Sequence, residues 1–364
     1  MSHTIGDVLA RVSRVAIALV FAGLACAPPA ASEVRDYVLK YADLGPPRGP
    51  RADSLMWWAQ EIEQRTNGRV KVKFLWSESL AKAEDTLKAV GSGLAEAGSI
   101  LSQYNPVDLP VWSLANAPSG GADPWVGMRT WQEMRQAVPE LQREAAQQGV
   151  RVVMNFTSGP VDILSKTPIL SEKDLHGRRI RSTGGWTPLL KSLGATTVNL
   201  SYPETYEALS KNTIDSAIGY IPFVKSYRQY EQAGYITESG LGQVLGYGAA
   251  INLNVWNGMP PDVRAIVAEV SDSFIDHYAR AYLEDVESTR KALAAGIDGK
   301  AVQFHALPPD ERQRWLARST FVDDWVKRMG AQGVDARRIV ETLRRTRAKY
   351  EAELAAKGYP WARQ

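Results

Sequence analysis

The amino-acid sequence predicts an α/β protein with two lobes, and three observations support this prediction. Short β-rich segments alternate with longer helical segments, which favours an α/β fold with mostly parallel strands. The alternation begins near residue 34, and a second block of the same kind begins at Val150, so two α/β units follow one another. The length of 364 residues also suggests about two domains, each large enough to bury a hydrophobic core.

The first block is expected to contain a strand, a helix, a second strand and a second helix. Their residues are 36–41, 54–66, 70–75 and 82–92. Asn67 and Gly68 close the first helix, because such residues readily adopt the left-handed conformation common at helix ends. Trp57, Trp58 and Ile62 give that helix one apolar face. The spacing therefore predicts that these tryptophans belong to the core.

A long surface loop is expected over residues 106–123. This stretch contains several prolines, the run Ser119-Gly120-Gly121 and little periodicity. A helix is expected to follow from Trp125. Loops of this length often border a functional site.

The second block repeats the alternation and then returns to the first lobe. Its expected strands are 151–156, 162–164, 179–182 and 197–200, and its expected helices are 187–193 and 203–211. A strand is expected over 249–255, where it could return the chain to the first lobe. Pro260 and Pro261 then open a helix that reaches about Ala295. At ~1.5 Å per residue, this helix is long enough to lie across both lobes.

The tail over residues 310–356 is expected to be helical and highly charged. Its basic side chains include Arg344, Arg345, Arg347 and Lys349. We interpret this basic cluster as solvated helix surface in preference to a polyanion site, because charge runs of this kind usually face water.

The composition excludes several classes of function. One cysteine and four histidines rule out a disulfide framework and a cysteine-rich zinc module. The 43 Lys and Arg residues are nearly balanced by 40 Asp and Glu residues, and the charges are interspersed along the chain. Nucleic-acid binding therefore gets no support from the charge pattern.

Residues 1–32 have the three-part layout of a secretory signal peptide. Arg11 and Arg14 precede an apolar run over 15–26, and small residues follow over 27–32. As a helix, the apolar run would span only about 18 Å of a hydrocarbon layer that is about 30 Å thick. A signal cleaved after Ala31 or Ser32 is therefore preferred over a retained anchor. The mature protein is then exported, soluble and periplasmic.

Cys26 raises the alternative of a lipoprotein. In Gly23-Leu24-Ala25-Cys26, however, the leucine stands one place too close to the cysteine for the usual lipobox order. Lipidation of Cys26 stays open as the less favoured alternative. After ordinary cleavage the mature chain keeps no cysteine, which suits an oxidising compartment.

Motifs for familiar catalytic chemistries are missing from the sequence. His176, His277 and His305 lie far apart, and none belongs to an HExxH-like pair, so no catalytic metal site is expected. The sequence also contains no GxSxG elbow and no phosphate loop with a GKS or GKT ending. We therefore expect neither a catalytic metal nor another cofactor, while a metal ion that assists ligand binding stays open.

Acidic pairs are the remaining possible source of catalysis. Asp323 with Asp324, and Glu204 with Glu207, have the residue types of an acid and a base. We interpret them as solvated helix charges, and a secreted α/β hydrolase that uses acidic residues remains the alternative. A non-enzymatic binding protein is favoured, with a small ligand enclosed in the cleft between two lobes.

The segment from Leu175 to Thr237 carries the most specific information. Its motifs are Asp174-Leu175-His176-Gly177-Arg178-Arg179-Ile180-Arg181, Leu193-Gly194-Ala195-Thr196, Tyr202-Pro203-Glu204-Thr205-Tyr206-Glu207-Ala208-Leu209 and Asn212-Thr213-Ile214-Asp215. These motifs resemble those of the DctP-type solute receptors of tripartite ATP-independent periplasmic (TRAP) transporters. Gly68-Arg69-Val70 and Met259-Pro260-Pro261 extend the resemblance over nearly the whole mature chain.

The resemblance implies a two-lobed periplasmic binding protein with a central cleft and a long helix that spans both lobes. It implies a first lobe of residues 33–157 plus 248–286 and a second lobe of residues 158–247 plus 287–364. In function, it implies a receptor that closes over a small organic anion. The receptor would deliver this ligand to the small and large integral membrane subunits of a TRAP transporter.

Arg181 matches the family arginine that pairs with the ligand carboxylate. A guanidinium suits this role because it is permanently charged and offers two parallel donors to a carboxylate. The backbone amides of residues 182–185 can add anion donors at the start of the following helix. Arg179 is the alternative candidate for the same role.

The chain departs from the sialic-acid-binding members of the family in two places. Gly219, beside Tyr220, stands where those members have an asparagine, and residues 159–164 contain no second arginine. A sialic-acid ligand, or a dicarboxylate held by two arginines, is therefore disfavoured.

The other candidate contacts around Arg181 are aromatic or small. They are Trp186, Tyr220, Gly219, Trp76, Ser102 and Tyr104. Some of these aromatic residues can instead serve the core. Together they predict a ligand with an apolar or planar body and one acid group. The preferred class is a compact monocarboxylate, either aromatic or a hydroxy or keto acid.

Overall fold

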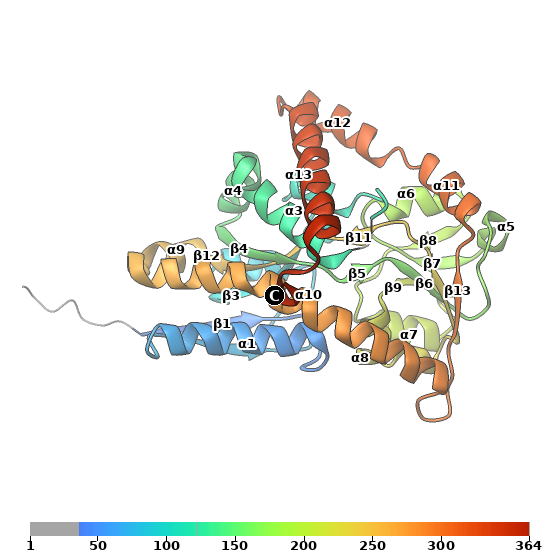
Figure 1. Cartoon of the computed structure of the whole chain (residues 1–364), viewed down its shortest axis with the longest axis horizontal. Helices are drawn as coiled ribbons and strands as arrows, with labels where there is room; N and C mark the ends of the chain where they lie inside the picture. The colour runs from blue at the N-terminus through green and yellow to red at the C-terminus, as the bar shows by residue number, and fades with distance from the viewer. Residues whose placement is uncertain (1–35, 122, 364) are drawn as a thin grey trace, which may run out of the picture. The chain divides into compact units, whose positions relative to one another are not determined.

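Two mixed β-sheets organise the chain, and helices pack on both faces of each sheet (Figure 1). The computed structural model describes residues 36–121 and 123–363. The predicted signal peptide over residues 1–32, including Cys26, lies outside the described residues.

The first sheet has five strands in the order β2-β1-β3-β12-β4. These strands are β1 (Tyr37–Ala42), β2 (Val70–Leu75), β3 (Ala97–Leu101), β4 (Val150–Phe156) and β12 (Tyr247–Asn252). Its accompanying helices are α1 (Pro50–Arg65), α2 (Thr86–Gly91), η1 (Trp112–Asn116), α3 (Pro124–Ala137), α4 (Pro139–Gln147) and α9 (Leu253–Gly258). Tyr247, Ala249 and Ile251 enter one core cluster and Ala250 enters the other, because successive side chains of a strand point to opposite faces.

The ends and the buried face of helix α1 follow from its local sequence. The helix starts with a proline at its first position and ends before Asn67, whose φ of 53° is left-handed. Trp58 and Ile62 are fully buried, as predicted for core residues. Trp57 is only half-buried and stacks on His277, with the ring centroids 4.0 Å apart.

The second sheet has six strands in the order β13-β10-β6-β9-β7-β8. Its strands are β6 (Asp162–Ser165), β7 (Arg179–Arg181), β8 (Thr196–Val198), β9 (Ser216–Gly219), β10 (Tyr235–Glu238) and β13 (Gln303–Ala306). Its helices are α5 (Glu172–Leu175), α6 (Trp186–Ser192), α7 (Thr205–Ser210), α8 (Ile221–Ser226) and η2 (Gln229–Glu231). The alternation of Ile163 and Leu164 between two core clusters again places apolar side chains on both faces.

The prediction of mostly parallel strands is confirmed, although both sheets are mixed. Four of the five strands of the first sheet and five of the six strands of the second run in one direction, and one strand in each sheet is reversed. Strand β12 is antiparallel to β3 and β4, and β6 is antiparallel to β9 and β10. Parallel neighbours usually need a helical crossover within one sheet. These two strands are instead entered directly from the other sheet, β6 after β4 and β12 after β10, so no crossover sets their direction.

Three segments connect the two sheets. Strands β5 (Gly159–Pro160) and β11 (Gln243–Val244) form a two-stranded antiparallel ribbon, and α10 (Pro261–Ala295) is the third connection. Gly159 has a φ of 100°, and a Cβ there would lie 1.7 Å from the Tyr282 hydroxyl, so only glycine fits this crossing.

Helix α10 confirms the predicted long helix across both lobes. Its 35 residues would extend over about 50 Å. Phe274 and Tyr278 pack in a core cluster of the first sheet, and Leu293 packs in one of the second. Figure 1 shows α10 running from the first sheet to the second. Within the described residues, the structure contains no helix that is both long and apolar enough to span a membrane.

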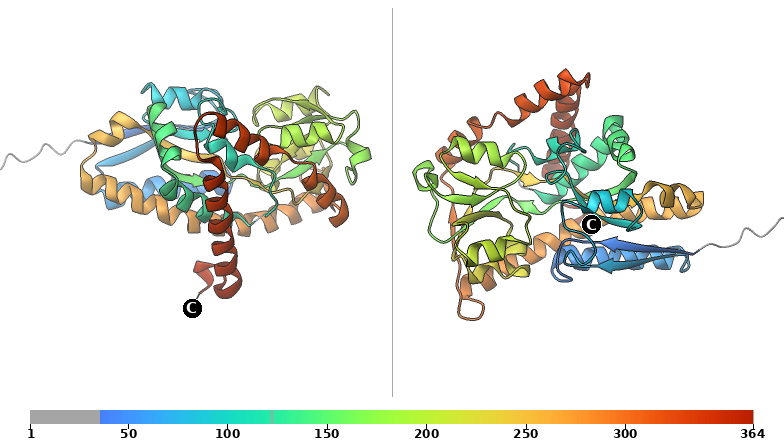
Figure 2. Two further views of the ribbon diagram at one scale, coloured as in Figure 1. Left: turned by 90° about the horizontal axis from the view of Figure 1, so that it is seen from above. Right: turned by 180° about the vertical axis from the view of Figure 1, so that it is seen from behind.

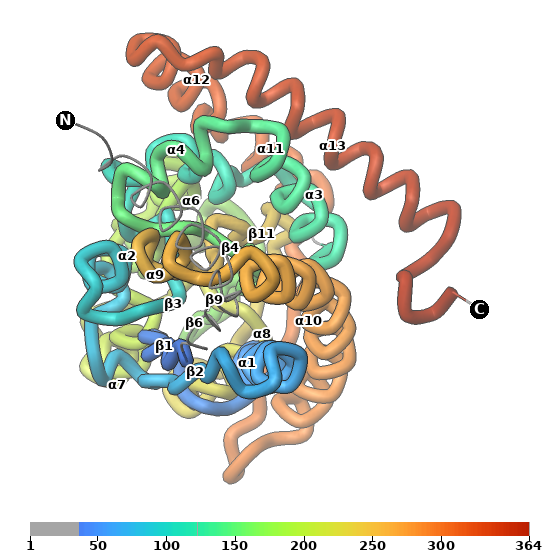
Figure 3. Tube along the Cα trace, turned by 90° about the vertical axis from the view of Figure 1, so that its left-hand side faces the viewer, coloured from blue at the N-terminus to red at the C-terminus, as the bar shows by residue number. Residues whose placement is uncertain are grey.

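The C-terminal tail divides between the two sheets. Trp315 of α11 (Pro309–Ala317) packs with the second sheet. Trp325 of α12 (Phe321–Ala331) and Ile339 of α13 (Ala336–Lys357) pack in a core cluster of the first. Helix α13 lies alongside α3, and the chain ends with η3 (Pro360–Ala362) (Figures 2 and 3). The expected second lobe includes all of residues 287–364, whereas α12 and α13 contact the first sheet. The lobe boundaries stay a prediction.

The segment over residues 106–123 is not wholly a surface loop, which corrects the sequence-based expectation. The η1 turn within it is buried, and the Trp112 indole N–H donates to the carbonyl of Leu141 at 3.0 Å. Its aromatic and aliphatic side chains complete the core beside α3 and α4, which a search for periodicity does not detect.

Candidate ligand-binding site

Arg181 lies at the end of β7, between β8 and β9, and is completely buried. Its Nε donates to the carbonyl of Leu200 at 2.9 Å, and its Nη2 donates to the Tyr104 hydroxyl at 3.0 Å. Its Nη1 is buried and makes no hydrogen bond to a described residue. Within the same residues, no carboxylate forms an ion pair with Arg181. Among the described residues, the guanidinium therefore has no counter-ion and keeps one unpaired donor group in the protein interior.

A buried charge without a counter-ion is costly. Effective desolvation penalties amount to several kcal/mol per ion, and proteins normally offset them with an opposite charge. The two neutral acceptors, Leu200 and Tyr104, offset the penalty only in part. An anion that accepts a hydrogen bond from Nη1 would neutralise the charge of Arg181 and pair its last free donor.

Arg179, the alternative candidate, occupies a different environment. Its side chain is 44% exposed and forms an ion pair with Asp215 at 2.6 Å. This carboxylate already accepts from both Nε and Nη2 of Arg179. Alternation along β7 thus sends Arg179 to the surface and Arg181 to the interior, which favours Arg181 as an anion anchor.

Four aromatic residues pack on one another beside Arg181, which two of them, Tyr202 and Tyr220, adjoin, and we call these four the aromatic cluster. They are Tyr202, Tyr220, Phe223 and Tyr227. The Arg181 guanidinium lies over the Tyr202 ring, 5.4 Å from its centroid. Such cation–π contacts stabilise a desolvated guanidinium without removing its charge.

Two hydroxyls of the aromatic cluster lack partners. The hydroxyls of Tyr220 and Tyr227 are buried and make no hydrogen bond of acceptable geometry with a described residue. Burial raises the pKa of the Tyr220 phenol far above its ordinary value, although the charge of Arg181 opposes this shift. The phenol of Tyr220 is therefore protonated at neutral pH and can donate to an anion beside Arg181.

Tyr104 links the two sheets at this point. It follows β3 of the first sheet, yet its hydroxyl accepts from Arg181 and from the backbone N–H of Tyr202 at 2.9 Å. A second link lies nearby, where the backbone N–H of Gly185 donates to the carbonyl of Asn116 at 3.2 Å. The buried arginine thus lies where the two sheets meet.

Ser102 and Trp186 make other contacts. The Ser102 hydroxyl donates to the carbonyl of Trp112 at 3.2 Å and accepts from the Asn116 side chain at 2.9 Å. It therefore holds in place the segment that contacts Gly185. Trp186 is 1% exposed and packs in a core cluster of the second sheet, while its indole nitrogen has no partner among the described residues.

Gly219 and Trp76 lie on different sheets. Gly219 ends β9, the strand next to Arg181, and a Cβ there would make ordinary contacts with Leu164 and Val224. Trp76 follows β2, stacks on Phe74 with ring centroids 4.5 Å apart, and lies 5.6 Å from the Arg51 guanidinium.

A second buried arginine was not identified from the sequence. Arg51 is 3% exposed, and its Nη1 donates to both oxygens of Asp43 at 2.7 Å. Ser99 also donates to Asp43, at 2.6 Å. Because Asp43 neutralises Arg51, this guanidinium has the counter-ion that Arg181 lacks.

Arg51 connects the first sheet electrostatically to the aromatic cluster. Burial raises the pKa values of Tyr227 and Tyr247, and the charge of Arg51 opposes both shifts. The Tyr247 hydroxyl is also buried and unpartnered among the described residues. Tyr202 and Tyr227 belong to the segment with the most specific motifs, so the sequence could have indicated them. Arg51 and Asp43 stand eight residues apart across one loop, and no sequence motif marks either of them.

Of the predicted contacts, the structure brings Tyr104 and Tyr220 together with Arg181. Gly219, on the adjacent strand, contributes no side chain, and Trp76, Ser102 and Trp186 contact other groups. Among the described residues, no three His, Cys, Asp or Glu side chains come together as a metal site would require.

Comparisons with known proteins agree with this architecture. The family model for DctP, described as bacterial extracellular solute-binding protein, family 7, matches residues 42–326. The C4-dicarboxylate-binding periplasmic protein DctP of Rhodobacter capsulatus is 26% identical over 317 residues, covering 86% of this chain and 93% of the relative.

Solved structures of TRAP solute-binding proteins share the fold. One from Rhodoferax ferrireducens, in complex with copurified benzoate, has a TM-score of 0.77 and 22% identity, covering 86% of this chain and 98% of the other. One from Bordetella bronchiseptica, with bound mandelate, has a TM-score of 0.77 and 19% identity, covering 86% and 99%. These likenesses confirm the two-lobed α/β fold. The chain therefore belongs to the DctP family of bacterial extracellular solute-binding proteins.

Proposed function

We propose that the protein is an extracytoplasmic receptor that binds a small organic acid through Arg181. The observation that carries this proposal is the fully buried guanidinium, which has no ion-pair partner among the described residues and one unpartnered donor, Nη1. A ligand carboxylate would accept from Nη1, and the Tyr220 hydroxyl is suited to donate to the same group. Closure around this pair removes water, which strengthens the attraction.

The aromatic cluster favours a compact monocarboxylate with a planar or apolar body. Its rings supply a large apolar area with few rotatable bonds, and its free hydroxyls can bind one further polar group of the ligand. Benzoate and mandelate, the ligands of the two related structures, have this chemistry. An aromatic, hydroxy or keto acid is therefore the class we propose.

The proposed partner of the receptor is a transporter in the membrane. The relative in Rhodobacter capsulatus is periplasmic, and the two related structures are TRAP solute-binding proteins. We infer that this protein also works in the periplasm and delivers its ligand to the integral membrane subunits of a TRAP transporter. Uptake of the labelled acid into vesicles that contain those subunits should require added receptor.

The hydrolase alternative gains no support from the acidic pairs. Glu204 accepts from the Ser201 backbone and hydroxyl at 2.8 and 2.7 Å, and Glu207 forms an ion pair with Lys211. Asp324 accepts from the Thr320 hydroxyl at 2.7 Å. These are local helix contacts, so no pair is arranged around a shared substrate position.

A parallel screen tests the proposal. A library of aromatic, hydroxy, keto and dicarboxylic acids is measured by thermal shift and for turnover, and each binding acid is then compared with its neutral amide. We expect saturable binding of a monocarboxylate without turnover. The amide should bind at least about 30-fold more weakly, because it lacks the charge that Arg181 requires. Equal binding of acid and amide, or turnover, would contradict the proposal.

A further inference from the structure

A cavity of about 340 Å³ lies between η1, α3, α12 and α13, apart from Arg181. We call it the α3–α13 cavity. Its lining is mainly apolar and includes Leu114, Trp131, Val340 and Leu343, together with the polar Thr130 and the charged Arg344. Ligand pockets typically enclose about 300–1,000 Å³, so this one has the size for a small organic molecule.

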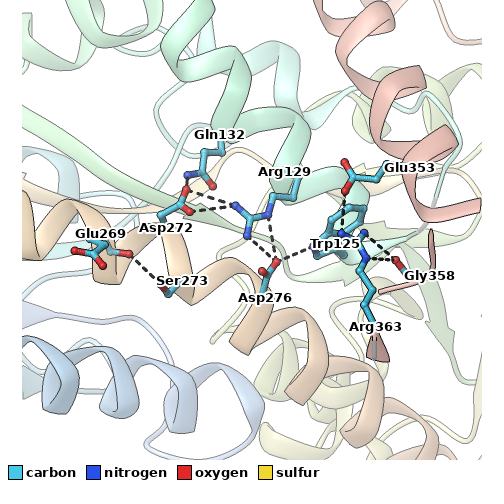
Figure 4. Close-up of polar contacts among 10 residues, drawn as sticks. All are labelled: Trp125, Arg129, Gln132, Glu269, Asp272, Ser273, Asp276, Glu353, Gly358 and Arg363. Carbon is cyan, nitrogen blue, oxygen red and sulfur yellow. Dashed lines mark hydrogen bonds and ion pairs between the residues drawn. The ribbon is translucent and has the colours of Figure 1, made fainter. Parts of the chain in front are cut away.

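The walls of the cavity are mainly apolar and come from anchored elements. Trp131 of α3 is buried, as is Val340 of α13. The opposite face of α3 is fastened to α10, because Asp276 accepts from the Trp125 indole at 2.7 Å and pairs with Arg129 at 2.7 Å (Figure 4). A site built on packed helices holds its shape better than one built on loops.

One buried hydroxyl in this lining lacks a hydrogen-bond partner within the described structure. Thr130 is 2% exposed, and its hydroxyl has no hydrogen-bond partner among the described residues. A threonine within a helix usually bonds a carbonyl in the preceding turn. The hydroxyl of Thr130 is therefore available to one polar atom of a bound molecule.

Arg344 provides the uncompensated charge of the cavity. It is exposed and forms no ion pair within the described part of the chain. The other charges have partners: Arg347 pairs with Glu351 at 2.8 Å, and Asp123 accepts from the Tyr359 hydroxyl at 2.6 Å while it caps α3. The sequence alone favours a solvated role for Arg344. Its position in the cavity lining also makes the unpaired guanidinium available to an anionic group of a bound molecule.

We propose that the α3–α13 cavity binds an amphipathic organic anion. Its aliphatic or aromatic body would lie against the apolar walls, and its carboxylate or sulfonate would lie beside Arg344. This site does not depend on the proposed ligand site at Arg181. The η1 turn separates the two, since Leu114 and Ala115 line the cavity and the next residue, Asn116, contacts Gly185.

Titration with 8-anilinonaphthalene-1-sulfonate tests this proposal, because the fluorescence of this aromatic sulfonate rises in an apolar site. The full mature chain should show one saturable site. Leu343→Trp, which fills the cavity, should weaken binding by at least 10-fold, and Arg344→Gln should weaken it by about 3- to 10-fold. The matched control Arg345→Gln removes a neighbouring exposed arginine that does not line the cavity, and it should leave binding unchanged.

The same titration can overturn the proposal in two ways. Unchanged affinity in Arg344→Gln, or in a Leu343→Trp variant that melts like the parent, would place the probe elsewhere. Loss of binding in Arg181→Lys would place it at the other site. Displacement by decanoate as well as by 2-naphthoate would show that aliphatic and aromatic bodies are both accepted. Displacement by neither would contradict the proposed ligand class.

Discussion

The hydroxyl of Tyr104 accepts a hydrogen bond from Nη2 of Arg181 at 3.0 Å, although Tyr104 follows a strand of the first sheet and Arg181 ends a strand of the second. The same hydroxyl also accepts from the backbone N–H of Tyr202. One phenol thus serves two buried donors of the second sheet. The positioning of Arg181 therefore depends on contact between the sheets.

Tyr104→Phe should weaken binding of the organic acid by about 5- to 30-fold. The variant leaves two buried donors without an acceptor, which costs about 1 to 2 kcal/mol and loosens the guanidinium. Calorimetric titration measures the change. Tyr206→Phe is the matched control, because its hydroxyl bonds to Glu231 and Gln232 away from Arg181. Equal affinity in both variants would show that Tyr104 does not position the arginine.

Tyr220→Phe should have opposite effects on folding and on binding. Its hydroxyl is buried without a partner in the described structure, so its removal should leave the free energy of unfolding unchanged or raise it. Ligand affinity should fall by about 10-fold or more, because a hydrogen bond to a carboxylate is lost. Urea unfolding and calorimetry on the same protein test both parts. A less stable variant with full affinity would refute the assigned role.

Gly159→Ala should destabilise the fold by about 2 to 4 kcal/mol. The new Cβ would meet the Tyr282 hydroxyl at 1.7 Å, and the φ of 100° is unfavourable for alanine. Gly177→Ala is the control. Its φ of 73° is also positive, but no atom lies within 4 Å of the added Cβ, so it should lose only about 1 kcal/mol. Equal losses in chemical denaturation would mean that the crossing tolerates a side chain.

Glu144 should make the protein less stable as the pH rises from about 5 to 8. Burial raises its pKa from 4.5 to about 8, even though the backbone N–H groups of Val111 and Trp112 donate to it and lower the value. The folded state then binds more protons than the unfolded state in this range, so the free energy of unfolding falls with pH, by at most about 1.4 kcal/mol per unit.

Unfolding curves at several pH values check the role of Glu144. Glu144→Gln should flatten the slope between pH 5 and 8. Glu207→Gln should not, because the ion pair with Lys211 lowers the pKa of Glu207 and leaves it ionised throughout this range. An unchanged slope in Glu144→Gln would assign the pH dependence to other groups.

Elements with strong local signals could be predicted from the sequence. Strand β2 has the predicted bounds, and α10 begins and ends within a residue of the prediction, because prolines and left-handed residues fix these ends regardless of tertiary contacts. The direction of β6 and β12, and the packing of α12 and α13 on the first sheet, depend on pairings between distant segments. No local pattern encodes these pairings.

Some residues of the candidate site could likewise be predicted from the sequence, and others could not. Arg181 and Tyr220 lie in or next to recognisable motifs, so sequence comparison could identify them. Arg51 becomes relevant only because the loop after β1 meets α8, where Arg48 Nε donates to the carbonyl of Ser226 at 2.6 Å. The burial that distinguishes Arg181 from Arg179 also required the structure.

Exchange of arginine for lysine at Arg181 and at Arg179 tests most directly the central claim that Arg181 anchors the ligand. Arg181→Lys keeps the charge but loses the paired donors, and Arg179→Lys makes the same change at the exposed ion pair. In calorimetric titration with the best acid from the screen, we predict about 30- to 4,000-fold weaker binding for Arg181→Lys, from a loss of about 2 to 5 kcal/mol. We predict unchanged binding for Arg179→Lys. Full affinity in a folded Arg181→Lys variant would contradict the assignment of Arg181 as the anchor of the ligand.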